Sequence, residues 1–320
     1  MKAAVIHSFT QPPAYEEIAD PTPQPHETLI HVRAAGVHPI VRGLASGQHY
    51  GSTAVFPQIP GVDGVGQLDD GTRVYFGLVR DPYGTLAELA AAPRQMCLPL
   101  PDTLDDATAA AIFNPGLSAW LALRQRGQLA QGETVLVLGA TGASGRLAVQ
   151  LAKLMGAGRV IAAGRDPQAL AQLPALGADA VISLDQPRPA LVQAIAEAGA
   201  QGIHVIIDYL WGAPAEAAIE AITRRGLAHH APRVRLVEVG SMAGPTISLP
   251  AAVLRSSGLE ISGSGMGTIP REQILAAVPQ FLDLAASGQL TVATRTAPLS
   301  EVGEVWAQAG DSRQRLVLLP

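Results

Sequence analysis

The stretch "ETVLVLGATGASGRLAVQLAKLMGAGRVIAAGRD", residues 133–166, decides the fold of this chain. An apolar run breaks into glycines, an alanine-rich segment of helical character follows, and a second apolar run comes next. Inside the stretch, "ATGASG" at 140–145 matches the pattern A-x-G-x-x-G, in which Ala140 takes the usual place of the first glycine. A strand, a glycine turn, a helix and a second strand predict a βαβ unit, which is the building block of a parallel sheet.

The glycine turn also has a chemical use. Gly142 lets the backbone approach a pyrophosphate, because no Cβ atom stands in the way. Gly145 lets the helix pack closely on the strand, and the free N–H groups at the helix N-terminus attract phosphate. We therefore predict that a dinucleotide binds here; the alternative is a tight turn without a ligand. The residues predicted to contact the cofactor in this turn are Ala140, Thr141, Gly142, Ala143, Ser144 and Gly145.

The second apolar run ends in Gly164 and Arg165, at the position where an acidic residue would bind the ribose 2′-hydroxyl of NAD(H). A guanidinium group can instead bind a 2′-phosphate through paired hydrogen bonds, and the small Gly164 leaves room for it. The sequence therefore favours NADP(H) over NAD(H). Two alternatives remain: Arg165 is an exposed loop charge, or the neighbouring Asp166 neutralises it or binds the ribose.

The length of 320 residues suggests about two domains. Residues 1–113 are rich in Pro and Gly, with short apolar runs typical of an irregular β domain. Residues 114–287 alternate apolar runs with helical segments, which predicts a doubly wound parallel sheet. Residues 288–320 return to short strands around one helix, and we expect them to rejoin the first domain. The strands predicted in the second domain are 134–139, 159–164, 180–184, 204–210, 234–240 and 259–265, and the helices 144–156, 167–176, 188–198, 213–225 and 270–287.

Composition and charge narrow the class of protein. The chain is 48% hydrophobic and has a formal net charge of −5, so the chain as a whole gives no electrostatic support for a nucleic-acid partner. Cys97 is the only cysteine, which excludes an intramolecular disulfide and a thiolate-rich zinc site. No run approaches the roughly 18 apolar residues of a membrane span, and we expect no signal peptide, because the apolar stretch near the N-terminus is too short for one. We expect a cytoplasmic protein with no membrane partner.

The order of motifs along nearly the whole chain resembles the medium-chain dehydrogenase/reductase superfamily, and within it the zinc-independent quinone oxidoreductase branch. That resemblance implies a Rossmann domain with a discontinuous, mostly β GroES-like catalytic domain. The stretches that carry it are "VRAAGVHPIVRGLASGQHY" (32–50), "FPQIPGVDGVGQL" (56–68), "GTRVYF" (71–76), "NPGLSAWLAL" (114–123), "GETVLVLGATGASGRLAVQLAK" (132–153), "HVIIDYLWG" (204–212) and the closing "RQRLVLLP".

The zinc-dependent members of the superfamily carry a cysteine where this chain has His38, and a His-Glu pair where it has Val62 and Asp63. The lobe with four closely spaced cysteines is absent from this sequence. A single possible ligand cannot hold a catalytic zinc, so the resemblance implies metal-free chemistry. It implies NADPH-dependent hydride transfer to a quinone or an α,β-unsaturated carbonyl. The quinone oxidoreductase branch usually has Asn at the His38 position, so this chain also departs from that pattern.

The resemblance also implies the catalytic residues. His38 lies at the position that contacts the active-site cleft in the family, where its imidazole could donate to a carbonyl oxygen; the alternative is a structural role that caps a turn before Pro39. Tyr50 matches the place of a tyrosine near the nicotinamide, and its hydroxyl could bind the substrate oxygen; the alternative is a wall residue. Asp63 is expected to be structural.

Further cofactor contacts are expected outside the glycine turn. Asn114 and Ser118 lie on the segment that enters the nucleotide-binding domain, and the resemblance puts Ser118 near the nicotinamide riboside or the phosphates. Strand ends on the carboxyl edge of a parallel sheet bind ligands in such folds. The residues expected beside the nicotinamide at that edge are Gly240, Ser241, Gly265 and Met266.

Two alternatives to the quinone or enone reductase remain open at this point. One keeps the fold but acts on simple aldehydes, ketones or alcohols. The other is a non-catalytic NADPH-binding protein. The resemblance further implies that two copies pair through the last strand of the nucleotide-binding sheet, within 258–266, to form a homodimer.

Overall fold

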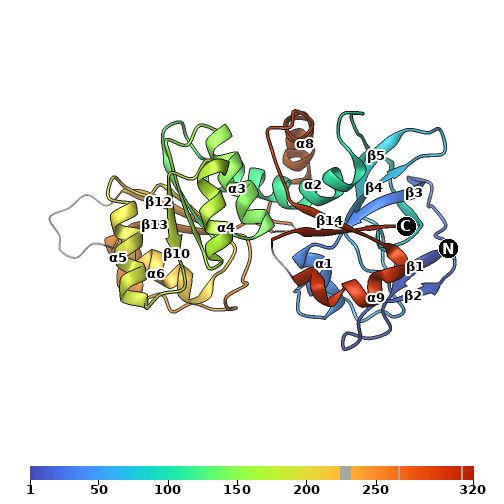
Figure 1. The fold of residues 1–320 in the computed structure, drawn as a ribbon, viewed down its shortest axis with the longest axis horizontal. Helices are drawn as coiled ribbons and strands as arrows, with labels where there is room; N and C mark the ends of the chain where they lie inside the picture. The colour runs from blue at the N-terminus through green and yellow to red at the C-terminus, as the bar shows by residue number, and fades with distance from the viewer. Residues whose placement is uncertain (224–231, 266, 311–312) are drawn as a thin grey trace. The chain divides into compact units, whose positions relative to one another are not determined.

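The computed structural model describes residues 1–223, 232–265, 267–310 and 313–320. The chain divides into two compact units (Figure 1). Unit 1 contains Met1–Pro115 and Leu282–Pro320, and unit 2 contains Gly116–Phe281. Unit 1 is therefore built from two separate parts of the chain.

Unit 2 contains a six-stranded sheet in which every pair of neighbouring strands is parallel. The strand order is β10-β9-β8-β11-β12-β13, which in chain order is the 3-2-1-4-5-6 arrangement of a doubly wound fold and confirms the predicted fold class. The strands are β8 (Thr134–Leu138), β9 (Arg159–Gly164), β10 (Ala180–Ser183), β11 (Val205–Asp208), β12 (Arg233–Glu238) and β13 (Gly258–Gly263). The helices in or entering this unit are α2 (Asp106–Leu121), α3 (Ala143–Leu154), α4 (Pro167–Gln172), α5 (Arg188–Ala198), α6 (Gly212–Ile222), α7 (Ala251–Ser256) and α8 (Arg271–Ala286).

Both faces of this sheet are covered, because every residue of the central strand β8 is buried. On one face, Leu136 and Leu138 of β8 belong to a core that also contains Leu191 and Ile195 of α5 and Ala217 of α6. Continuous apolar strands of this kind are typical of parallel sheets between two helical layers. The predicted helix 213–225 extends to residues that lie outside the described part of the chain; the described helix α6 ends at Ile222.

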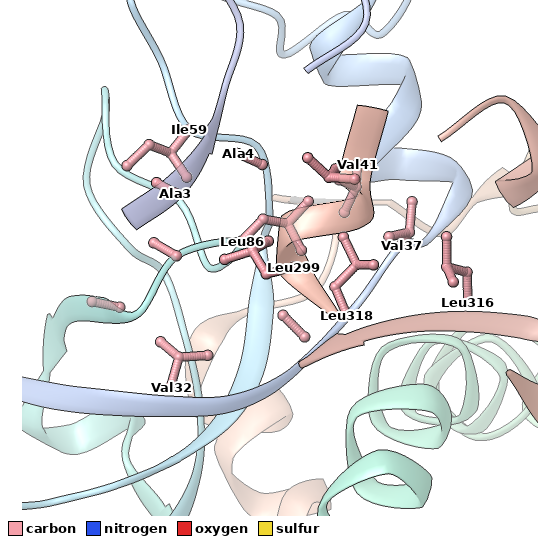
Figure 2. Packing of buried hydrophobic residues seen from close by; sticks show 14 of the residues in the cluster. Ala3, Ala4, Val32, Val37, Val41, Ile59, Leu86, Leu299, Leu316 and Leu318 are labelled. Atoms are coloured by element: carbon pink, nitrogen blue, oxygen red, sulfur yellow. The ribbon is translucent and has the colours of Figure 1, made fainter. Parts of the chain in front are cut away.

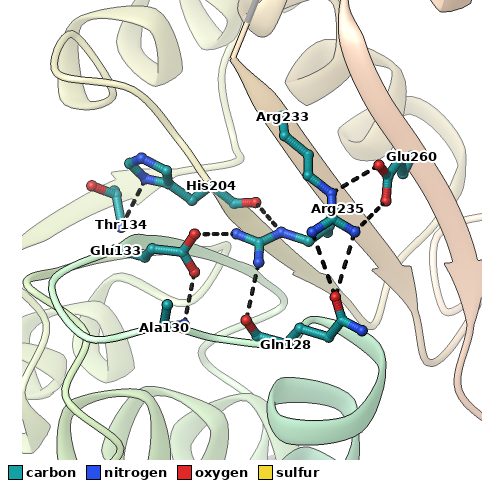
Figure 3. A network of polar contacts seen from close by, with 8 residues as sticks. All are labelled: Gln128, Ala130, Glu133, Thr134, His204, Arg233, Arg235 and Glu260. Carbon is teal, nitrogen blue, oxygen red and sulfur yellow. Dashed lines mark hydrogen bonds and ion pairs between the residues drawn. The ribbon is translucent and has the colours of Figure 1, made fainter.

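A polar network holds the amino edge of the same sheet (Figure 3). Arg235 of β12 is buried, and its guanidinium donates to Glu133 at 2.5 Å and to the Gln128 carbonyl at 3.0 Å. The neighbouring Arg233 is exposed and pairs with Glu260 of β13 at 2.8 Å. These bonds tie β12 to its neighbour β13 and to the loop before β8, at the edge opposite the glycine turn.

Unit 1 is mostly β structure. Its seven-stranded sheet has the order β14-β15-β3-β4-β5-β7, and β6 pairs with β3 outside this path. Strand β15 pairs antiparallel with β3, so the C-terminal segment joins the same sheet as the N-terminal part. The elements are β1 (Lys2–Val5), β2 (Ala14–Glu17), β3 (Glu27–Gly36), α1 (Pro39–Ala45), β4 (Asp63–Gln67), β5 (Arg73–Gly77), β6 (Leu89–Pro93), β7 (Leu98–Pro99), β14 (Thr294–Pro298), α9 (Val302–Val305) and β15 (Arg315–Leu319).

The core of unit 1 joins residues that are far apart in the sequence (Figure 2). Ala3 and Ala4 of β1 pack with Leu86, and Leu299 and Leu318 from the C-terminal segment belong to the same cluster. Burying these aliphatic side chains is the main favourable contribution to the stability of this unit. The core therefore depends on the return of the chain after α8.

The structure differs from the sequence interpretation in the helices of the first 121 residues. The region up to 113 was expected to be irregular β structure, but α1 begins at Pro39 and α2 begins at Asp106. Proline at the first helical position has the φ angle of a helix and lacks only an N–H that has no partner there. The alanine-rich segment that opens α2 has high helix propensity, and the helix continues through Pro115.

Candidate functional site

The glycine turn joins β8 to α3 as the sequence pattern predicts. Gly139 has a φ of +88°, a conformation that residues with a Cβ atom rarely adopt. Gly142 is the N-cap residue of α3, and no side chain forms a capping hydrogen bond there. The first N–H groups of α3 are thus not bound by a capping side chain, and the positive end of the helix dipole lies beside them. This arrangement suits an anionic group.

Two close approaches depend on glycine. A Cβ atom on Gly145 would overlap the carbonyl oxygen of Gly139, and it would lie 2.7 Å from the Cα atom of Ala140. A Cβ atom on Gly164, at the end of β9, would overlap the side chain of Thr141. Both close approaches hold the glycine turn against the ends of β8 and β9. The first involves backbone atoms, which cannot move aside as a flexible side chain can.

Arg165 follows β9 directly, and its side chain is exposed. The adjacent Asp166 is the N-cap of α4, where its carboxylate accepts hydrogen bonds from Gln168 N at 2.9 Å and Ala169 N at 3.1 Å. The Asp166 oxygen Oδ1 is therefore already used by the helix. Arg165 forms no hydrogen bond or ion pair with the other described residues, so its guanidinium is available to a ligand.

The other predicted cofactor contacts of unit 2 lie at the carboxyl ends of β12 and β13. Gly240 N donates to the Asp208 carbonyl at 3.2 Å, and Ser241 is exposed. Gly265 follows β13 in a turn closed by Thr268, whose hydroxyl accepts from Gly265 N at 3.0 Å. Met266 lies outside the described residues.

Asn114 and Ser118 are both on α2 and are half-buried. Residues four apart on a helix share one face, so the two side chains point in the same general direction. They fall on different sides of the boundary between the two units. Their predicted roles at the cofactor remain predictions.

His38 lies inside unit 1, with 1% of its surface exposed. Its Nε2 atom is 3.5 Å from Asp63 Oδ1, and the hydroxyl of Tyr75 donates to Asp63 Oδ2 at 2.9 Å. Arg315 of β15 donates to the backbone carbonyl of Val37 at 3.1 Å, and Val37 is the residue directly before His38 in the chain. The side chain of His38 makes no capping bond to α1, so the structure does not support the alternative of a turn cap. We call His38, Asp63, Tyr75 and Arg315 the buried polar cluster.

Electrostatics decide which members of this cluster carry charge. Burial lowers the pKa of His38, although the neighbouring Asp63 opposes this shift. Burial, together with the Asp63 carboxylate, raises the pKa of Tyr75 well above its ordinary value. Burial lowers the pKa of Arg315 to about 10, which still leaves it a cation at neutral pH. His38 is therefore neutral, and the cation that faces Asp63 in this cluster is Arg315.

Sequence reasoning did not single out Tyr75 and Arg315. The only local signal is a polar or charged residue within the apolar runs "RVYFG" and "RLVLL". Arg315 and Val37 are 278 residues apart, so no spacing rule connects them. A buried arginine almost always has a partner, which is a reason to look for an acid elsewhere in such a sequence.

Tyr50 is very different from His38, since 78% of its surface is exposed. Its ring stacks at 4.1 Å, tilted by 31°, on the ring of His49. The His49 ring in turn accepts a hydrogen bond from Gly51 N at 3.0 Å. The exposed hydroxyl is accessible, as a group that binds substrate must be. Its role at the substrate is still a prediction.

Within the described ranges, no group of three or more His, Cys, Asp or Glu side chains is arranged to hold a metal ion. Cys97 is half-buried, and burial raises the pKa of its thiol to about 11. His38 and Asp63 are together, but a third ligand is not beside them in the described part of the chain. No helix of the described chain is long and apolar enough to cross a membrane.

Comparison with known proteins gives consistent results. A family model described as zinc-binding dehydrogenase matches residues 143–286. A protein of Emericella nidulans named as a probable NADPH-dependent quinone reductase is 29% identical over the full length of both chains. Human quinone oxidoreductase is 33% identical over 169 residues, covering 49% of this chain and 50% of the human one. The crystal structure of quinone oxidoreductase from Thermus thermophilus, also solved with NADPH, is 29% identical, covers both chains completely and has a TM-score of 0.83.

The fold, the glycine turn and these similarities agree. Over its full length the chain is similar to quinone oxidoreductases of the medium-chain dehydrogenase/reductase type.

Proposed function

We propose that this protein is an NADPH-dependent oxidoreductase that transfers hydride, without a metal, to a quinone or an α,β-unsaturated carbonyl compound. The observation that carries the proposal is the helix N-terminus of α3, which lacks a side-chain cap and follows a turn that only glycines allow. The similarity to relatives named for NADPH and quinones supports the same conclusion.

The residues of unit 2 fit the cofactor. The N–H groups of Ala143 and Ser144 at the start of α3 would receive the pyrophosphate. The unpaired guanidinium of Arg165 would bind the 2′-phosphate, a group that NAD(H) lacks. Because Asp166 already caps α4, it does not compete for Arg165 through Oδ1. The carboxyl edge at Gly240, Ser241 and Gly265 would receive the nicotinamide end.

The chemistry proposed needs no Lewis acid. When bound, the reduced nicotinamide supplies a hydride. A conjugated substrate spreads the incoming charge onto an oxygen atom, so the protein has to orient the substrate and stabilise that oxygen. We propose that the exposed hydroxyl of Tyr50 donates to this oxygen. His38 is buried and neutral, and we propose that it supports the reaction indirectly, through the shape and polarity of the buried polar cluster at the start of α1.

Zinc independence is supported by the ligands that are missing from the sequence. The chain has one cysteine, whose thiol is protonated at neutral pH, and Val62 stands beside Asp63 where the zinc-dependent enzymes have a His-Glu pair.

The assembly proposed is a homodimer. Strand β13 lies at the edge of the six-stranded sheet, and Ile261 is one of its exposed side chains. An edge strand with free N–H and C=O groups is a template for pairing with a second copy. Light scattering of wild type and Ile261→Lys tests this: the wild type should have twice the mass of the variant, and a monomeric wild type would refute it.

The decisive experiment measures NADPH and NADH affinity for wild type, Arg165→Ala and the control Arg124→Ala. Arg124 is also an exposed arginine of unit 2, but it lies on the π-helical segment after α2 rather than after β9. We expect wild type and the control to prefer NADPH by at least tenfold, about 1.4 kcal/mol, and Arg165→Ala to lose that preference. Equal binding of both nucleotides by wild type would remove Arg165 from this role, and binding of neither would refute the proposed function.

A further inference from the structure

A small hollow lies on unit 1, where the loop between β1 and β2, helix α1 and the end of α9 come together. Figure 1 shows α1 and α9 next to each other within this unit. The hollow has a volume of about 190 Å³, which is below the roughly 300–1,000 Å³ of sites that take drug-sized ligands. A ligand for it is therefore small, with room for one ring.

Arg42, in the last turn of α1, brings a positive charge to this hollow. Its guanidinium lies against the backbone of Gly310, because a Cβ atom on that glycine would be 2.9 Å from Arg42 Nη1. It forms no hydrogen bond or ion pair with the other described residues, and no Asp or Glu is among the described residues that line the hollow. The charge is uncompensated in a chain whose formal net charge is −5, so it favours an anionic ligand.

Two aromatic side chains, Phe9 and Trp306, line the same hollow. Neighbours hold Phe9 on two sides: its ring meets the ring of Phe56 edge-on at 5.0 Å, and a Cβ atom on Gly47 would lie 2.8 Å from it. Trp306 follows α9 directly and packs with part of its surface on the core of unit 1. Rings that are already fixed lose little conformational freedom when a ligand binds. These walls favour an apolar, flat group beside the charge.

The polar groups around Arg42 also suit an acceptor rather than a donor. The side-chain amide of Gln11 and the indole N–H of Trp306 form no hydrogen bond with the rest of the described chain. The hydroxyl of Ser46 already donates to the Gly43 carbonyl at 3.2 Å. A carboxylate has two acceptor oxygens that match the paired N–H groups of a guanidinium. Of the common anions, a carboxylate on a flat ring uses both the charge and the aromatic walls.

We propose that this hollow of unit 1 binds a small aromatic carboxylate, whose carboxylate group pairs with Arg42 and whose ring contacts Phe9 and Trp306. Inorganic phosphate would satisfy the guanidinium but leave the aromatic walls unused, and a neutral ring would do the reverse. Each half of the ligand therefore adds to its affinity. All the residues that carry this inference belong to unit 1, so it does not rest on the proposed function, whose cofactor residues are mainly in unit 2.

The test uses benzoate as the probe and the cofactor-free protein, labelled with nitrogen-15 at tryptophan. The chain has three tryptophans, and the other two, Trp120 and Trp211, belong to unit 2. Trp306→Phe assigns the third indole signal. We expect benzoate to shift the Trp306 signal to saturation, with a Kd on the order of 1 mM for so small a ligand, and to leave the other two in place. Propionate, which has no ring, and benzyl alcohol, which has no charge, should each bind at least tenfold more weakly.

Arg42→Gln removes the charge at the hollow, and Arg94→Gln is the matched control, because Arg94 is an exposed arginine of unit 1 that does not line the hollow. We expect Arg42→Gln to weaken benzoate binding at least tenfold and the control to bind as wild type does. Unchanged Trp120 and Trp211 signals show that the variant is folded. Arg42→Lys, which keeps the charge but not the paired N–H groups, takes its place if Arg42→Gln does not fold, and it should bind more weakly than wild type.

Four results would overturn the inference. A Trp306 signal that does not move with benzoate would mean that the hollow binds no aromatic carboxylate, and a shift of Trp120 or Trp211 instead would place the ligand elsewhere. Equal affinity of wild type and the Arg42 variant would remove Arg42 from the site. Propionate or inorganic phosphate that binds as tightly as benzoate would reduce the site to a general anion contact of Arg42.

Discussion

The α-carbon of Gly145 lies so close to the carbonyl of Gly139 that a single added methyl group would overlap that oxygen. The two residues belong to the same glycine turn, on either side of the N-terminus of α3. Their contact sets how near the helix comes to the end of β8, and hence where its free N–H groups lie. Glycine at position 145 is therefore needed both for the close packing of α3 on β8 and for the position of the N–H groups proposed to bind the cofactor.

Replacing Gly145 by alanine is therefore expected to damage both stability and cofactor binding. The methyl group meets backbone atoms, so α3 has to shift, and overpacking of this kind costs about 1–3 kcal/mol. Chemical denaturation measures the free energy of unfolding, and titration measures NADPH affinity. Gly263→Ala is the matched control, because a Cβ atom there meets nothing within 4 Å. Equal stability and affinity in the two variants would contradict the importance of the close approach.

Tyr75→Phe tests the buried polar cluster. The variant removes the hydroxyl that donates to Asp63 Oδ2 at 2.9 Å and leaves that buried carboxylate oxygen without this donor. Hydrogen bonds to charged groups contribute about 1.5–3 kcal/mol, and we expect a loss of that size in the free energy of unfolding. Tyr83→Phe is the control, since the half-buried Tyr83 makes no side-chain hydrogen bond to the described residues. A loss no larger than that of the control would mean that the hydroxyl is dispensable.

His38→Asn should change the acid dependence of stability. Burial lowers the pKa of His38 below its ordinary 6.5, so the unfolded chain binds a proton that the native protein resists. The contribution of His38 to the free energy of unfolding therefore falls as pH drops below about 6.5. The asparagine variant has no group that titrates there, so its free energy of unfolding should not fall for this reason. Unfolding free energies of wild type and variant, measured across this range, give the difference. His31→Asn serves as the control, because His31 is exposed beside Asp69. Parallel curves for wild type and His38→Asn would show that His38 titrates as it does in the unfolded chain.

Asp208 is expected to give the free energy of unfolding the opposite dependence on pH. Its pKa rises from 3.8 to about 6 on folding, so the native protein keeps a proton that the unfolded chain releases. The free energy of unfolding should fall as pH rises through this window, by an amount on the order of 3 kcal/mol. Asp208→Asn removes the titrating group and should flatten this part of the curve, whereas the exposed Asp185→Asn should leave it as in wild type. A wild-type curve that rises between these pH values, with no effect of Asp208→Asn, would contradict the raised pKa.

The fold was largely predictable because its signals are local. The glycine turn, the apolar runs and their spacing lie within segments of about ten to thirty residues, and the six parallel strands follow from them. The turn residues of the candidate site were predictable for the same reason, because the contact of Gly145 with Gly139 spans only six positions. Helix α2 was missed because a proline at 115 argues against a helix interior, although the helix continues through it.

The buried polar cluster was not predictable in the same way. Arg315 reaches the backbone of Val37 only because β15 returns to pair with β3 at the end of the chain. The neighbouring positions of Asp208 and Glu238 likewise depend on the register of β11 and β12, which α6 separates in the chain. A sequence pattern predicts that strands exist and which face is apolar, but charges that meet across strands require the register itself.

Tyr50→Phe is the sharpest test of the proposed chemistry, because Tyr50 is exposed and its hydroxyl is not used by the fold. If the hydroxyl donates to the oxygen on which charge develops, its loss should lower kcat at least tenfold with quinone or enone substrates, while stability and NADPH affinity stay unchanged. His49→Phe, which keeps an aromatic partner against the Tyr50 ring, is the control for loop geometry. A kcat for Tyr50→Phe that matches wild type would remove Tyr50 from the reaction. An equal fall in both variants would assign the effect to the position of the loop rather than to the hydroxyl.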